Sequence, residues 1–226
     1  MNIIRLTKLS KFLHMLRLRF DKSPIDRMDS FVEFVHTRSA YVAQTSLYGY
    51  LKARMGRQYV EIFKDEKFAP SLTMSKWSVY TACLSDLSIY AVAILSRHGG
   101  LSREDAEALG QFCIAQCVAA TFKGTHAASI RDEALQELLD RNGKTVWANA
   151  ATGELAFAKS PEALANSSPV SEEFQELDRE IVMNSVRFRW NNIRDEFSRR
   201  LDPVAVLEDW KRIRVAMLPK TKASDS

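Results

Sequence analysis

The feature that most constrains this chain is an apolar stretch from Lys76 to Leu95, which reads KWSVYTACLSDLSIYAVAIL. It approaches the length of a membrane-spanning helix, but Asp86 lies near its centre and hydroxyl side chains dilute its apolar character. A central aspartate costs about 2.5–3.5 kcal/mol on membrane-insertion scales. The stretch therefore predicts the central core helix of a globular protein, and His98-Gly99-Gly100 should end it.

The rest of the chain carries helical apolar periodicity and few residues that break helices. Its 226 residues include 8 glycines and 6 prolines, with 46% hydrophobic and 27% charged side chains, an ordinary globular composition. We expect an all-α fold, a single-domain helical bundle of about seven helices over residues 23–218. Residues 144–170 should form a small hairpin around Thr152-Gly153 or a surface loop insertion, and residues 219–226 a disordered tail.

Residues 171–201 predict one long helix that carries two apolar stripes. At 1.5 Å per residue it would reach about 45 Å. The first stripe contains Phe174, Leu177, Ile181 and Phe188, and the second, shifted stripe contains Val186, Trp190, Ile193, Phe197 and Leu201. Asp202-Pro203 combines an N-cap residue with proline at the first helical position, so a further helix should begin there.

The first 22 residues, here called the N-terminal segment, predict a separate basic amphipathic helix. Five lysines and arginines precede the first acidic residue, Asp21, and the apolar side chains gather on one side of a helical wheel. Such a helix can lie in a membrane interface, dock on its own domain or in a partner's groove, or serve as a cleaved targeting signal. The residues expected to contact a membrane or a partner are Arg5, Lys8, Lys11, Phe12, Leu16 and Arg19.

Charge is distributed unevenly along the chain. Residues 1–60 carry 11 basic and 4 acidic side chains, residues 61–186 carry 11 and 18, and residues 187–226 carry 10 and 6. Basic ends around an acidic middle fit either contact with a polyanionic surface or attraction between the segments themselves. Three cysteines in apolar stretches and no secretory cleavage site indicate a cytoplasmic protein, peripheral on the inner membrane if the N-terminal segment binds it.

Asp86 is the most informative single residue, because a carboxylate within a buried helix needs a partner. Arg38 lies in the middle of the apolar face of its own predicted helix. We therefore predict that Arg38 and Asp86 form a buried polar pair. Such a pair either fixes the register of two helices or lines a polar pocket between them.

Catalytic chemistry has few candidates in this sequence. No G-x-S-x-G elbow is present, and His98 lies about 18 Å beyond Asp86 along a continuous helix, so the weak candidates for catalysis are Ser85 with His126. Glu33-x-x-His36 lacks the second copy that a di-iron site requires, and Cys113-x-x-x-Cys117 lacks a second ligand pair, so no metal is expected. Nucleotide-binding loops are also absent, so no cofactor is expected.

Nucleic-acid binding is not favoured either. Five arginines between Arg187 and Arg200 surround Phe188 and Trp190, but Trp190 lies on an apolar stripe, and Asp195 and Glu196 dilute the charge. No known recognition motif accompanies them. A solvated amphipathic face explains this pattern best.

Two stretches carry a resemblance to other proteins. RSAYVAQTSLYGYLKARMG, followed by KWSVYTACLSDLSIYAVAIL, resembles a group of uncharacterised proteobacterial helical proteins, some of which are labelled "esterase". The resemblance covers about the first 95 residues and implies, as one alternative, a hydrolase acting on lipid-like or small ester substrates. The residues themselves favour a non-catalytic accessory, assembly or scaffolding protein that binds a membrane surface or a protein partner through residues 1–22.

Overall fold

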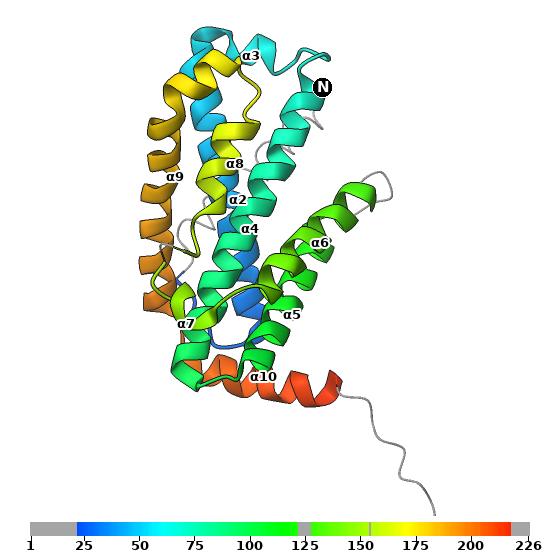
Figure 1. The fold of residues 1–226 in the computed structure, drawn as a ribbon, viewed down its shortest axis with the longest axis vertical. Helices are drawn as coiled ribbons and strands as arrows, with labels where there is room; N and C mark the ends of the chain where they lie inside the picture. Colours follow the sequence, from blue (N-terminus) through cyan, green and yellow to red (C-terminus); the bar gives the residue numbers. More distant parts are fainter. Residues whose placement is uncertain (1–21, 122–127, 154, 218–226) are drawn as a thin grey trace, which may run out of the picture.

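The computed structural model describes residues 22–121, 128–153 and 155–217, and this part of the chain is all-α (Figure 1). An all-α bundle of about seven helices is therefore confirmed. Two of the labelled helices, α3 and α7, are single turns. The α-helices are α2 (Met28–Met55), α3 (Tyr59–Ile62), α4 (Ala69–Gly99), α5 (Arg103–Thr121), α6 (Ala128–Gly143), α7 (Trp147–Ala150), α8 (Lys159–Ser167), α9 (Glu172–Arg200) and α10 (Pro203–Met217).

Helix α4 is the centre of the bundle, as the sequence predicts. It packs against α2 and α8 on one side and against α5 and α6 on the other (Figure 1). By length and composition α4 could cross a membrane, yet 83% of its most apolar 18-residue window is buried inside the protein. Its apolar surface is therefore covered by neighbouring helices.

The predicted helix ends at Gly100 and Asp202 are confirmed, and Ser102 caps the start of α5. Gly100 ends α4 in the left-handed region, at φ 59°, and its backbone N–H donates to the carbonyl of Ser96. Ser102 accepts a hydrogen bond from the backbone N–H of Asp105 at 3.1 Å, and Asp202 accepts one from the N–H of Ala205 at 3.1 Å. Both side chains satisfy N–H groups that a helix leaves free in its first turn.

The prediction of a surface insertion over residues 144–170 is wrong. This segment contains α7 and α8, has no strand among its described residues, and lies in the core between α4 and α9. Ala156 and Leu164 are fully buried, and the Phe157 ring stacks on Trp190 with centroids 4.7 Å apart. Thr152-Gly153 does form a turn, with Gly153 at φ 91°, but short helices flank it because their apolar side chains can pack against α4.

The beginning of the described chain is joined to the end of α9. Ile25 is fully buried and forms a parallel bridge with Leu201. Its N–H donates to the carbonyl of Arg200 at 2.7 Å, and its carbonyl accepts from the N–H of Asp202 at 2.9 Å. The chain then turns into α10, which crosses the end of the bundle (Figure 1). The predicted N-terminal helix, apart from Lys22, and the predicted tail lie outside the described residues.

Candidate functional site

The buried carboxylate of Asp86 is the centre of the polar core. Its Oδ1 accepts a hydrogen bond from Nη1 of Arg141 at 2.6 Å and from the backbone N–H of Lys159 at 3.2 Å. Its Oδ2 accepts from the backbone N–H of Ser160 at 2.7 Å. Helices α4, α6 and α8 therefore meet at one side chain, which is fully buried.

The neighbours of Asp86 extend this network. Nη1 of Arg141 also donates to Oγ of Ser85 at 2.8 Å, and Nη2 donates to the carbonyl of Ala156 at 2.9 Å. Nε1 of Trp190 donates to Oγ of Ser160 at 2.8 Å, which connects α9 to the network. Burial raises the pKa of the Asp86 carboxyl, whereas Arg141 and Ser160 act in the opposite direction.

The predicted pair of Arg38 and Asp86 is wrong, although both residues are buried. Nε of Arg38 donates to Oε2 of Glu196 at 2.9 Å, and Nη2 of Arg38 lies 2.5 Å from Oε1 of the same residue. Helices α2 and α4 are neighbours, as the prediction requires. Their hydrogen-bond partners, however, place Arg38 towards α9 and Asp86 towards α6 and α8.

Of the two weak catalytic candidates, the structure describes only Ser85. Ser85 is buried and its Oγ accepts from Arg141, whereas His126 lies outside the described residues. His98 is exposed at the end of α4. The three cysteines are buried as small apolar side chains, and burial raises the pKa of the Cys83 thiol well above its ordinary value.

The two possible metal ligands, Glu33 and His36, do not share one environment. Glu33 is exposed, whereas His36 is partly buried and its Nδ1 lies 2.9 Å from the Tyr80 hydroxyl. That hydroxyl in turn lies 2.7 Å from Oγ1 of Thr121. Within the described ranges, no group of three or more His, Cys, Asp or Glu side chains could hold a metal ion.

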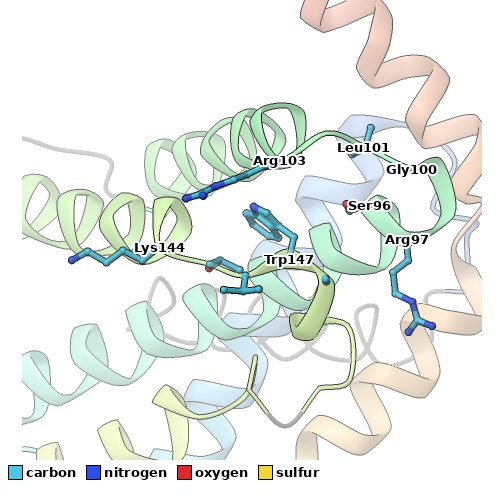
Figure 2. A pocket seen from close by; sticks show the side chains of 10 residues that line it. Ser96, Arg97, Gly100, Leu101, Arg103, Lys144 and Trp147 are labelled. Atoms are coloured by element: carbon cyan, nitrogen blue, oxygen red, sulfur yellow. The ribbon is translucent and has the colours of Figure 1, made fainter.

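A pocket of about 530 Å³ opens where α4 ends, between the start of α5 and the link from α6 to α7. Its lining includes Arg97, Arg103 and Lys144 together with the indole of Trp147, and it contains no acidic residue. Figure 2 shows that Arg97 points away from Trp147 and that Lys144 extends outward, so the three cations do not converge. The pocket offers diffuse positive charge at the surface.

The outer face of α9 exposes a row of large apolar side chains. The second predicted stripe is buried, apart from the partly buried Leu201, but the first remains on the surface, with Phe174 40%, Leu177 69%, Ile181 72% and Phe188 72% exposed. We call these four residues the α9 stripe. More large apolar side chains are exposed here than on any other described helix. Such a row normally marks a contact surface.

Sequence reasoning noted the α9 stripe without assigning it a role, and it missed Arg141 and Ser160 entirely. The signal for the stripe was available, because one helix with two apolar stripes can bury both only if it has neighbours on both sides. No comparable signal points to Arg141, which the sequence places at the polar end of an ordinary amphipathic helix.

Comparison with known proteins gives no match to this chain among protein-family models, curated proteins or solved structures. The class of the protein therefore rests on its own architecture, an all-α helical bundle. Any function rests on the chemistry of its surfaces and its buried polar centre.

Proposed function

We propose that this protein is a non-catalytic accessory, assembly or scaffolding protein that works through contact surfaces. The observation that carries the proposal is the α9 stripe. Four large apolar side chains stand on one face of a helix whose opposite face is fully packed. Keeping such residues in water is unfavourable unless they contact another molecule.

The N-terminal segment supplies the second proposed surface. Its basic and apolar residues suit either an anionic membrane or a protein partner. The polar centre supports the same proposal, because Asp86, Arg141 and Ser160 are all occupied in joining helices to one another. These contacts account for a structural role.

Flotation on anionic liposomes tests where the N-terminal segment binds. The wild-type chain is compared over a salt series with a full-length Phe12→Glu/Leu16→Glu variant. We expect the wild type to float, to float less at high salt, and to lose flotation in the variant, because both the apolar face and the cations contribute to interfacial binding. If neither form floats, the segment docks on its own domain or binds a protein partner.

A hydrolase assay tests the rival class. We expect no turnover of short-chain or lipid-like esters that depends on Ser85 or His126. Ester turnover by the wild type that is abolished in both Ser85→Ala and His126→Ala, with circular dichroism unchanged, would refute the non-catalytic proposal.

A further inference from the structure

We propose that the α9 stripe is the seam of a homodimer, in which α9 of one copy lies antiparallel to α9 of a second copy. The inference rests on the proposed role of α9 as a contact surface and names its partner. It is argued from the spacing of the apolar residues and from the distribution of charge along the helix.

The apolar residues follow a heptad pattern. Phe174, Ile181 and Phe188 are separated by seven residues each, and Leu177 lies three after Phe174, which corresponds to positions a and d of a coiled coil. The next d position is Asn184. Opposing Leu177 of one copy to Phe188 of the other also brings Ile181 opposite Asn184. The seam then contains two polar residues per copy, Asn184 and Asn191, and they face Ile181 and Phe174 of the other copy.

In this register, the charged residues beside the seam of one copy lie next to residues of opposite charge in the other copy. On one side of the seam the flanking positions are Glu173, Glu180 and Arg187, so the sign changes halfway along the helix, and all three side chains are exposed. On the other side they are Asp178, which is buried and paired with Arg54, and the uncharged Ser185 and Asn192. In the antiparallel arrangement Glu180 of each copy lies beside Arg187 of the other. A parallel pair would instead put like charges at the same level. Charge complementarity of this kind selects orientation and partner.

The helix dipole does not account for this pattern. Acidic residues near the N-terminus and basic residues near the C-terminus do stabilise an isolated helix, but only within its first and last turns. Glu180 and Arg187 both lie in the interior of α9 (Glu172–Arg200). They are seven residues apart, about 10 Å along the axis, which is too far for an ion pair within the helix.

Sedimentation equilibrium of the full chain, followed by charge-swapped variants, tests the dimer. At about 100 μM, where micromolar dimers are assembled, we expect a mass of twice 25.7 kDa. Glu180→Arg and Arg187→Glu should each sediment as monomers, because each places like charges side by side twice. An equimolar mixture of the two variants should form a dimer, because every contact between different chains is then complementary. The control is Glu137→Arg, at an exposed position of α6. It changes the net charge of the chain as Glu180→Arg does, and this variant should remain dimeric.

Several outcomes overturn the proposal. A monomeric wild type does so, as does a dimer that both single variants preserve, or a mixture that fails to associate. If the wild type is monomeric but Phe12→Glu/Leu16→Glu dimerises, the N-terminal segment of the same chain covers the stripe. If every form is monomeric, the stripe is left for a different protein. Flotation of the Glu180→Arg variant separates these failures from failure of the proposed function, since membrane binding does not require the seam.

Discussion

Asp86, on α4, caps the N-terminus of α8, which has no capping side chain of its own. The residue before α8 is Ala158, which makes no side-chain hydrogen bond to the first turn. The two backbone N–H groups that open the helix, those of Lys159 and Ser160, donate to Asp86 instead. A carboxylate at this place satisfies free donors and interacts favourably with the helix dipole.

Asp86→Ala should therefore lower the free energy of unfolding by about 3 kcal/mol, because Arg141 loses its carboxylate partner and the first turn of α8 loses two acceptors. Urea unfolding measures the loss, and amide hydrogen exchange should accelerate in α8 more than in α2. The control, Asp132→Ala, removes an exposed carboxylate and should change stability by less than about 0.5 kcal/mol. Equal losses in the two variants would contradict the capping role.

The ion pair of Asp178 with Arg54 predicts that the stability of the fold depends on pH. The guanidinium of Arg54 and the hydroxyl of Tyr50 donate to Asp178 and lower the pKa of this carboxyl, while burial and Asp178 raise the pKa of Tyr50 to about 12. A carboxyl whose pKa is lower in the folded chain stabilises the fold above its unfolded pKa, about 3.9, and loses this effect as pH falls. The urea midpoint of Asp178→Asn should thus lie below that of the wild type at pH 7, and the gap should close towards pH 2. A gap that is constant with pH would contradict the ion pair.

At the scale of helices, α5 and α6 pack closely where Gly110 of α5 faces the side-chain amide of Asn142 on α6. A Cβ at Gly110 would lie 2.0 Å from Oδ1 of that side chain. Asn142 is itself buried, and its Nδ2 donates to the carbonyl of Glu107 at 2.9 Å. The two helices are held close by this contact, and no side chain larger than hydrogen fits at position 110 without movement.

Gly110→Ala should destabilise the protein by about 1–3 kcal/mol, because Asn142 must be displaced from a packed interface. Gly49→Ala is the matched control. The nearest atom to its Cβ is 3.8 Å away, on Arg189, so it should gain about 0.5–1 kcal/mol from the higher helix propensity of alanine. Thermal unfolding of the two variants should move in opposite directions, and a shared direction would refute the steric argument.

The sequence predicts where the helices of this protein lie along the chain better than it predicts which residues contact one another between helices. The apolar stripe of α4 and the inner stripe of α9 are visible as periodicity, because burial of one helix face leaves a regular pattern. The pairing of Asp86 is not visible in that way. Arg38 and Arg141 are equally plausible from composition, and only the tertiary packing brings Arg141 to Asp86. The prediction for residues 144–170 is wrong because Thr152-Gly153 and two prolines are typical of a hairpin or loop, whereas the structure buries Ala165 where α8 packs close to α4 and α9.

At the scale of the whole molecule, the junction of Ile25 with Leu201 joins the first described residues to the last two helices. Met28 adds a further contact, since its N–H donates to Oδ2 of Asp209 on α10 at 2.9 Å. Contacts between such distant parts of a chain couple the stability of its ends to that of its core.

Ile25→Ala should lower the free energy of unfolding of the entire bundle by about 3 kcal/mol, because a fully buried side chain is truncated. Far-UV circular dichroism reports all helices, and tryptophan fluorescence reports Trp190 and Trp210 in the core. The two signals should shift together in urea, as expected of one cooperative unit. Separate transitions would show that residues 23–218 are not a single domain.

The same junction determines where the N-terminal segment leaves the bundle, beside the carboxyl end of α9. In an antiparallel dimer the two exits lie at opposite ends, about 55 Å apart when Leu177 faces Phe188. The dimer would then carry one N-terminal segment at each end and could bind two membranes or partners at once. It could draw two vesicles or two partner complexes together, whereas a parallel dimer would anchor twice to one surface.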